Sequence, residues 1–342
     1  MDQAPGVAGG QNASRPRDDS PRDDSPRDSG SNADAPPPRI SQNLTRQSGA
    51  PKLSAPHSGS PLAERFYRAE MGSRFRSWIL SRGESDLWIG VSPESWKPEM
   101  EDSARRALLD ARAHIEGYEP PGFGEARNLL DAPSLDAPAP GAAAGQPLYV
   151  RAGHEFFVRS LAPLPDDSGA PLVVRAMLRA GLAAGVGPMA AVAGAIAEYV
   201  GKALKTAFGC EEVIVENGGD LWLSFSRPLE IAVFAGTSPL SNHFAVELSP
   251  ELSPCGLCTS SGTVGPSLSF GYADASVILC ADAARADAWA TASCNAVKTA
   301  EDIDPVLSML KTKPDVLGSL IVVGDRMGIQ GRFRLLPLAP RC

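Results

Sequence analysis

The chain has 342 residues and a formal net charge of −8 at pH 7, with no run of lysine and arginine and no basic residues interleaved with aromatic ones. This mildly acidic balance argues against nucleic acid as a partner, because nucleic-acid-binding domains carry clustered positive charge. Small and polar residues follow Met1, without a basic start or an apolar core. We therefore expect no secretory signal and a cytoplasmic location.

Residues 1–60 differ in composition from the rest of the chain. They are dominated by Pro, Ser, Asp, Arg, Asn and Gly, and residues 16–30 repeat a P-R-D-D-S unit. Such a segment buries too little apolar surface to offset an ordering entropy of roughly 1–2 kcal/mol per residue. We expect a disordered low-complexity tail over 1–60, acting as a spacer or a docking arm, and one folded domain over 61–342.

The first folded elements are predicted from local pattern. Residues that favour β-structure lie on both sides of a turn at 81–84 and predict an antiparallel hairpin within 64–92. Apolar residues at helical spacing predict a helix over 99–117. The Pro/Ala/Gly-rich stretch at 119–147 is aperiodic and is interpreted as an inserted loop, and the aromatic run at 156–161 predicts a short strand.

The second half of the chain mixes long helices with hairpins. Pro171 suits the first position of a helix that ends near Ala184, and a second helix is predicted over 189–207. Further helices are predicted at 283–297 and 303–310, and strands at 212–216, 220–225, 229–235, 243–248, 256–264, 274–281, 321–324 and 327–333. This order predicts an α+β fold, in which helices pack on one face of an antiparallel sheet.

The uncharged stretch at 180–197 is mostly Ala and Gly and is interrupted by Gly187-Pro188. A membrane-spanning helix needs about 20 strongly apolar residues, so we expect a buried helix and no membrane partner. Four segments rich in small residues follow one another from here, at 185–198, 215–221, 259–267 and 286–292. Small residues let backbone approach a ligand closely, but close helix packing and a plain hairpin turn at Asn217-Gly218-Gly219 explain them equally well.

The six cysteines are Cys210, Cys255, Cys258, Cys280, Cys294 and Cys342. Without a secretory signal, free thiols are the default. Cys255 and Cys258 form a single C-x-x-C, and no second pair has the spacing of a four-ligand zinc site. Buried thiols, a redox pair and a metal site stay open as interpretations of this pair.

Polar side chains in the small-residue segments suggest a cation and an anion site. Asp287 and Thr291 are four residues apart on a predicted helix and therefore project from one face. A carboxylate and a hydroxyl are hard oxygen ligands that suit Mg²⁺. The run Thr259-Ser260-Ser261-Gly262 offers hydroxyls and backbone N–H groups to an anion. The lysine-containing phosphate loop and the G-x-S-x-G elbow of hydrolases are both absent from the sequence.

Together these segments resemble the ApbE family, whose enzymes are FAD:protein FMN transferases, and more closely a bacterial and archaeal branch of the ApbE superfamily. The resemblance covers about residues 62–333, without the inserted loop. It is carried by E-N-G-G-D (216–220), T-S-S-G (259–262), A-D-A-W-A-T-A (286–292), G-V-G-P-M-A-A-V-A-G-A-I-A-E (185–198), E-S-D-L-W-I-G-V (84–91) and H-E-F-F-V-R-S-L-A-P-L (154–164).

The resemblance implies an ApbE-like fold related to the T-fold, with Mg²⁺ and FAD or FMN bound in a cleft. It implies Mg²⁺ ligands at Asp287, at Thr291 and at the backbone carbonyl of Val192. It implies cofactor contacts at Asn217, Gly218, Gly219, Asp220, Thr259, Ser260, Ser261, Gly262 and Glu198, and it indicates no catalytic residue. By analogy with T-fold proteins, it also adds the expectation of a homo-oligomer.

Two departures from the family pattern bear on the reaction. Ala193 stands where the family has a lysine, and the histidine-rich segment that follows T-S-G in the family has no counterpart after His243. The sequence therefore supports two hypotheses. The first is a protein that binds a flavin or a similar pyrophosphate ligand with Mg²⁺ at Asp287 and Thr291, and either transfers FMN or cleaves the pyrophosphate. The second is a non-catalytic small-molecule-binding or assembly module on the same fold.

Overall fold

The computed structural model describes residues 39–42, 74–121, 152–264 and 269–338. Internal contacts divide the chain into Met1–Pro36, which lies outside the described residues, and Pro37–Cys342. Most of the predicted tail, the start of the 64–92 segment and the predicted loop beyond residue 121 also lie outside them.

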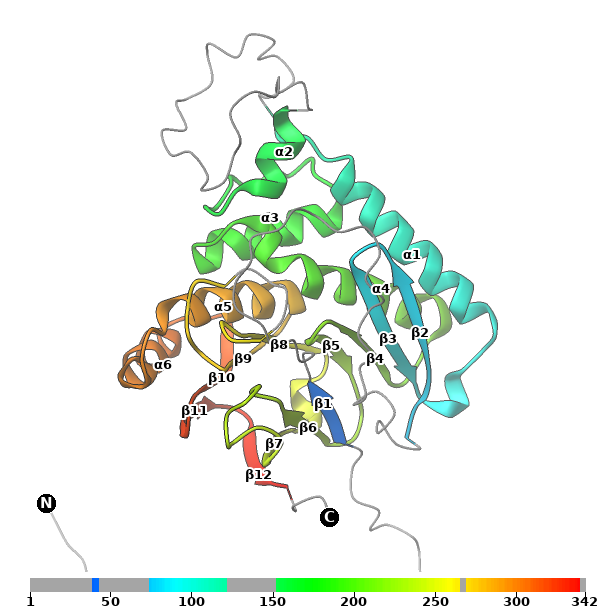
Figure 1. The fold of residues 1–342 in the computed structure, drawn as a ribbon. Coiled ribbons are helices and arrows are strands. Elements are labelled where there is room, and N and C mark those ends of the chain that lie inside the picture. Colours follow the sequence, from blue (N-terminus) through cyan, green and yellow to red (C-terminus); the bar gives the residue numbers. More distant parts are fainter. Residues whose placement is uncertain (1–38, 43–73, 122–151, 265–268, 339–342) are drawn as a thin grey trace, which may run out of the picture. The chain divides into compact units, whose positions relative to one another are not determined.

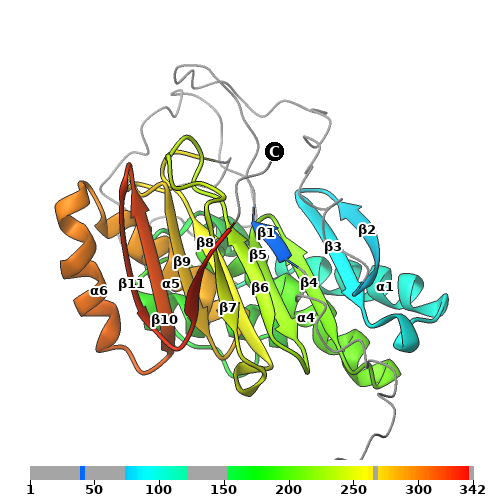
Figure 2. The same cartoon turned by 90° about the horizontal axis from the view of Figure 1, so that it is seen from below.

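An antiparallel sheet of eight strands forms the centre of the fold, with the strand order β11-β10-β9-β8-β5-β4-β3-β2 (Figures 1 and 2). Its strands are β2 (Arg76–Arg82), β3 (Ser85–Val91), β4 (Val213–Asn217), β5 (Asp220–Ser224), β8 (Cys255–Ser260), β9 (Ala275–Cys280), β10 (Val316–Val323) and β11 (Arg326–Gly331). The antiparallel pairing confirms three predicted hairpins, namely β2–β3, β4–β5 and β10–β11.

A second sheet of four strands has the order β1-β6-β7-β12. It consists of β1 (Arg39–Gln42), β6 (Leu229–Val233), β7 (Phe244–Leu248) and β12 (Arg334–Pro337). Strand β1 pairs in parallel with β6, so four residues of the predicted tail form a strand. This strand depends on a distant segment of the chain. Strand β7 pairs with one edge of β6, and the backbone N–H and C=O groups on the other edge of β6 pair with β1.

Six α-helices accompany the sheets, namely α1 (Glu99–Glu116), α2 (Ala152–Arg159), α3 (Leu172–Ala184), α4 (Val192–Phe208), α5 (Ala283–Ala296) and α6 (Ile303–Lys311), all within the part of the chain that the structure describes. A short 3-10 turn at Pro188–Ala191 precedes α4. Gly185 and Gly209 end α3 and α4 in the left-handed conformation, with φ of 76° and 64°. Glycine adopts that conformation without steric cost, so both helices end close to the ends predicted at Ala184 and residue 207.

Helix α2 corrects the strand predicted at 156–161. The aromatic run favours β-structure locally, but the segment is helical and buries Phe157 completely. The Phe157 ring packs edge-on against Tyr118, with ring centroids 5.0 Å apart. Glu155 and Arg159 form an ion pair at helical spacing, with 3.2 Å between Oε1 and Nη2. Tertiary packing has therefore overridden the β-propensity of the two phenylalanines.

Two hydrophobic cores lie on the two faces of the eight-stranded sheet. One contains α1, α3, α4 and α5 with the side chains of that face, and the other contains side chains of the opposite face with β6 and β7. In Figure 1 the helices lie above the sheet and the second sheet below it. The predicted α+β class with helices on one face is confirmed, and the second sheet on the other face is an addition to it.

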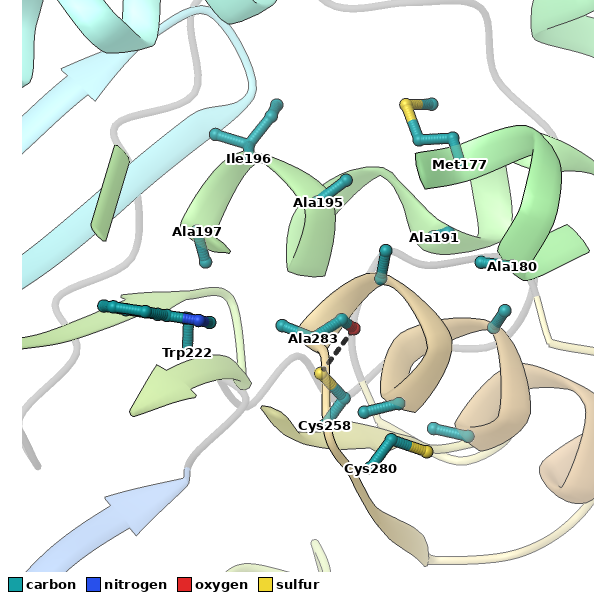
Figure 3. Packing of buried hydrophobic residues seen from close by; sticks show 14 of the residues in the cluster. Met177, Ala180, Ala191, Ala195, Ile196, Ala197, Trp222, Cys258, Cys280 and Ala283 are labelled. Carbon is teal, nitrogen blue, oxygen red and sulfur yellow. Dashed lines mark hydrogen bonds between the residues drawn. The ribbon is translucent and has the colours of Figure 1, made fainter. Parts of the chain in front are cut away.

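Small side chains bring α4, α5 and the sheet into close contact. A Cβ on Gly194 of α4 would lie 2.3 Å from the Ala283 carbonyl oxygen of α5, and one on Gly201 would lie 2.1 Å from Cε3 of Trp222. Figure 3 shows the alanines between these elements, with Trp222 beside Ala197. The small-residue run at 189–197 therefore packs helices against each other and against the sheet.

Within the described residues, no one helix combines the length and apolarity needed to cross a membrane. One pair bent by 106°, Leu172–Ala184 with Pro188–Phe208, meets those criteria only when its two helices are taken together.

Candidate functional site

The N-terminus of α4 and the middle of α5 meet through Asp287. The Oδ2 atom of Asp287 accepts a hydrogen bond from the Gly194 backbone N–H, at 2.9 Å. N–H groups in the first turn of a helix have no partner within the helix, so a carboxylate is favourable there. Asp287 is only 7% exposed. The predicted metal ligand therefore also stabilises the start of α4.

The β4–β5 turn lies against the same helix terminus. Gly218 and Gly219 have φ of 70° and 105°, which confirms the predicted tight hairpin. Asn217 Nδ2 donates to the Ala193 carbonyl at 3.2 Å, and Glu216 Oε1 accepts from the Gly219 N–H at 2.8 Å. The turn is thus tied to α4, and it places Asp220 at the first position of β5.

Asp220 and Asp287 form a buried pair of carboxylates. Asp220 is 8% exposed, and no donor among the described residues reaches its Oδ1. Burial raises the pKa of Asp220 well above its usual range, and the negative charge of Asp287 raises it further. Burial also raises the pKa of Asp287, although the backbone N–H groups of Gly194 and Ala193 oppose that shift. Such a pair favours a bound proton or a bound cation.

Two hydroxyl groups stand beside this pair, and they come from β8 and α5. Ser260 Oγ lies 3.1 Å from Thr291 Oγ1. Thr291 follows Asp287 by one helical turn, so its hydroxyl projects from the same face. Alternation along β8 puts Ser260 on the helix-covered face of the sheet and Thr259 on the opposite face. The predicted hydroxyl segment is therefore divided between two faces.

The other two residues of that segment shape the loop after β8. Ser261 Oγ accepts hydrogen bonds from the backbone N–H groups of Thr263 and Val264, at 3.2 and 3.0 Å. Gly262 permits a close chain crossing, because a Cβ there would lie 1.9 Å from the Gly271 carbonyl oxygen. Both residues hold the loop in shape through these contacts.

Glu198 and Val192, two further predicted site residues, both lie on α4. Glu198 Oε2 accepts from the Ala283 backbone N–H at 2.7 Å, one turn before Asp287. Glu198 also lines a cavity of about 860 Å³ whose walls are α1, α3 and α4. It therefore connects that cavity to the start of α5. Val192 is the first residue of α4, and its half-buried side chain packs against the helix-side core.

Cys255 and Cys258 point to opposite faces of β8, one into each hydrophobic core. Cys258 Sγ donates to the Ala283 carbonyl oxygen at 3.4 Å, and Figure 3 marks this contact with a dashed line. Cys258 also contacts Asp220, a neighbour that sequence patterns did not reveal. Burial is the main cause that raises the pKa of the Cys258 thiol, and the negative charge of Asp220 raises it further. A redox pair and a shared metal ion both require the two thiols on the same side of the strand. Of the three interpretations of this pair, only that of two buried thiols agrees with the geometry.

We expect Cys255 and Cys258 to resist thiol reagents in the folded protein. Both side chains are fully buried, and burial raises the pKa of Cys255 to about 12. Thiolates are the reactive form, so labelling should require unfolding. The measurement is the rate of modification, followed by peptide mass spectrometry under native and denaturing conditions. Fast native labelling of either residue, or a disulfide between them, would contradict this arrangement.

In the described part of the chain, no three His, Cys, Asp or Glu side chains converge as ligands of one metal ion. The Asp220–Asp287 pair is a different kind of site. It combines two carboxylates with neighbouring hydroxyls, which matches the way Mg²⁺ is held by one or two carboxylates together with phosphate oxygens and water.

The sequence model of a family described as "AbpE bacteria" matches residues 148–324, which include every residue of this site. A UPF0280 protein of Methanothermobacter thermautotrophicus is 35% identical over 269 residues, covering 75% of this chain and 94% of that protein. The chain therefore belongs to the AbpE bacteria family, and with it to the ApbE-like superfamily that the motifs indicated.

Other relatives match more closely over shorter stretches. A UPF0280 protein of Methanoculleus marisnigri is 48% identical over 174 residues, covering 51% of this chain and 70% of that protein. One of Methanosphaerula palustris is 49% identical over 143 residues, covering 42% of this chain. The matched part spans 60% of the length of the Methanosphaerula protein.

Among solved structures, the chain is similar to the flavin transferase ApbE from Vibrio cholerae, with a TM-score of 0.45 and 10% identity over 75% of this chain and 97% of that one. The apo form of the Pseudomonas stutzeri flavinyl transferase ApbE gives a TM-score of 0.42 and 12% identity over 75% of this chain and 94% of that one. At this level of similarity, no residue role in the present chain follows from either structure.

Proposed function

We propose that this protein binds a flavin nucleotide through its pyrophosphate, together with Mg²⁺, at the junction of α4, α5, β5 and β8. The single observation that carries the proposal is the buried Asp220–Asp287 pair, in which one carboxylate oxygen has no donor among the described residues. Two like charges held together away from water need a compensating cation or proton. The flavin part rests on the resemblance of the motifs to the ApbE family.

The residues fit a magnesium ion. Asp287, Asp220, Thr291 and the Val192 carbonyl are oxygen donors, which Mg²⁺ prefers to nitrogen or sulfur. When bound, the ion would offset the charge of the pyrophosphate and polarise its phosphorus–oxygen bonds. The Gly194 N–H holds one oxygen of Asp287 in place and leaves the remaining lone pairs of that carboxylate for the ion.

The other groups of the site would orient the ligand. Ser260 and Thr291 present a pair of hydroxyls 3.1 Å apart beside the carboxylates, and hydroxyls can donate to phosphate oxygens. Asn217 holds the β4–β5 turn on the Ala193 carbonyl, so it positions Asp220 relative to α4. We assign Asn217 a positioning role, and the hydroxyls a contact with the phosphates.

For the reaction, we propose transfer of FMN from FAD to a hydroxyl group of an acceptor. The hydroxyl oxygen forms a bond to the phosphorus of the FMN half, the pyrophosphate bond breaks, and AMP leaves while the hydroxyl proton is released. Ligand binding without turnover is the second candidate. The second candidate is favoured by Ala193, which replaces the lysine of the family pattern, and by the lack of histidine after His243. Transfer needs a group that stabilises charge developing on the phosphate, and both departures remove such a group.

The test is a titration of the purified full-length protein with FAD, with and without Mg²⁺, followed by flavin fluorescence and by mass spectrometry of the products. We expect Mg²⁺-dependent binding, and a loss of at least about 10-fold in affinity for Asp287→Ala, because replacing even a residue that only supports a metal ligand typically costs about 10–100-fold. Asp304→Ala is the control, because Asp304 is an exposed acid on α6. Release of FMN or its attachment to protein supports transfer, and binding without product supports the second candidate. Absence of any binding by the unaltered protein would refute both.

A further inference from the structure

Two aromatic side chains project into solvent from the segment between β8 and β9. Phe270 is 54% exposed and Tyr272 is 62% exposed, and they flank the buried Gly271. Single exposed apolar residues are common on proteins, but two large rings within three residues beside a polar site are a candidate contact surface.

The backbone that carries these rings is held firmly against the C-terminal end of α5. The Phe270 N–H donates to Asn295 Oδ1 at 2.7 Å, and the Tyr272 N–H donates to the Val297 carbonyl at 2.9 Å. A Cβ on Gly271 would lie 1.6 Å from the Cys294 carbonyl oxygen, so the chain passes directly over the helix there. The exposure of the rings is therefore a property of an anchored segment.

The same segment borders the proposed phosphate site. The Gly262 N–H donates to the Ala273 carbonyl at 2.9 Å, which joins the segment to the loop that begins just after Ser260. Asn295, which anchors Phe270, follows Thr291 by four residues on α5, a rise of about 6 Å along the helix. The backbone of Phe270 is thus anchored on α5 about one helical turn beyond Thr291, and that of Tyr272 at Val297, just past the end of the helix.

We propose that Phe270 and Tyr272 form the surface on which the planar ring of the bound nucleotide stacks. This inference rests on the proposed function, which places the pyrophosphate at Asp220–Asp287, and it adds the location of the ring. Aromatic side chains bind planar rings by offset stacking, and rigidly held rings do so with little loss of conformational entropy. The chemistry fits either the isoalloxazine ring of a flavin or an adenine base.

The experiment compares three probes in the presence of Mg²⁺, namely FMN, ADP and inorganic pyrophosphate, measured by calorimetry on the full chain. Pyrophosphate reports the phosphate site alone, ADP carries an adenine ring together with a diphosphate, and FMN carries a flavin ring together with a single phosphate. We expect Tyr272→Ala and Phe270→Ala each to weaken one ring-bearing probe by about tenfold and to leave pyrophosphate binding unchanged. The probe that loses affinity identifies the ring that stacks there.

Two control variants accompany the test. Tyr272→Phe keeps the ring and should retain affinity, and Leu161→Ala removes an apolar side chain that is 64% exposed elsewhere. If pyrophosphate, FMN and ADP bind equally well to the alanine variants and to the unaltered protein, the inference is overturned while the proposed function stands. If the unaltered protein binds none of the three probes, the proposed function fails and the inference fails with it. Changes confined to self-association would assign the rings to a contact between copies and also overturn the inference.

Discussion

Replacement of Arg74 by methionine is expected to lower the free energy of unfolding by about 3–5 kcal/mol, the usual cost of leaving one charge of a buried ion pair without its partner. Arg74 Nε donates to Glu212 Oε2 at 3.0 Å, and the side chains of both residues are at most 5% exposed. Arg74 also donates to the carbonyls of Pro228 and Arg227, at 2.7 and 3.0 Å. The substitution leaves two carbonyls without these donors, and it leaves Glu212 with the exposed Arg227, 3.5 Å away, as its remaining charged partner.

Chemical denaturation of the variant measures the loss, and two further variants interpret it. Arg334→Met breaks an exposed ion pair with Glu247 and should change stability by about 0–1 kcal/mol. Arg74→Met combined with Glu212→Leu removes both charges and should recover much of the loss, because the desolvation penalty disappears with them. A single Arg74→Met variant as stable as the unaltered protein would show that the pair contributes nothing.

The same ion pair predicts a loss of stability in acid. Burial alone would raise the pKa of Glu212, but hydrogen bonds from Arg74 and from Ser226 outweigh it and lower the pKa to about 2. A lowered carboxyl pKa stabilises the fold above the pKa of the unfolded chain, and that stability disappears as pH falls toward the folded pKa. We therefore expect the contribution of Glu212 to be lost between about pH 4.5 and pH 2. The free energy of unfolding of the Arg74→Met variant should depend less steeply on pH over this window.

Replacement of Asp220 by asparagine is the second large effect, and it should act in opposite directions on stability and on binding. The amide removes one of two neighbouring buried negative charges, so the ligand-free protein should gain roughly 1–3 kcal/mol at neutral pH. The same change removes an oxygen ligand of the proposed Mg²⁺ site. Stabilisation of the unaltered protein by Mg²⁺ follows from binding to the folded state, and the variant should lose it.

Thermal unfolding with and without Mg²⁺ measures both effects on one protein. Asp304→Asn provides the control at an exposed acid, where neither stability nor the response to Mg²⁺ should change. A variant that is less stable than the unaltered protein would indicate that Asp220 is held by favourable contacts. A variant that keeps the full response to Mg²⁺ would remove Asp220 from the metal site.

Local pattern was sufficient for most of the secondary structure. Glycine at the hairpin turns and at the ends of α3 and α4 placed those boundaries, because only glycine adopts the required left-handed conformation cheaply. The alternation of strands and the spacing of apolar residues predicted the antiparallel sheet and the long helices, and the α+β class followed from their order. The motifs also indicated the family to which the chain belongs.

Three features depended on contacts between distant segments. The aromatic run of α2 favoured a strand locally, but the segment is a helix whose Phe157 is buried against Tyr118. Strands β1 and β12 pair with β6 and β7 from opposite ends of the chain, and no local pattern specifies such partners. Alternation on β8 separated Thr259 from Ser260 and Cys255 from Cys258, so residues adjacent in a motif have different surroundings.

The sequence by itself therefore determined most of the elements, the fold class and the family, since these follow from local conformational preference and from the spacing of residue types. The tertiary structure alone decided the electrostatics of the site. Asp220 and Asp287 are ordinary carboxylates in the sequence, and their pKa values rise because β5, β8, α4 and α5 together exclude water around them. Desolvation depends on every neighbouring group in space, and for that reason the motifs, which placed both acids in one cleft, could not predict that their pKa values are raised.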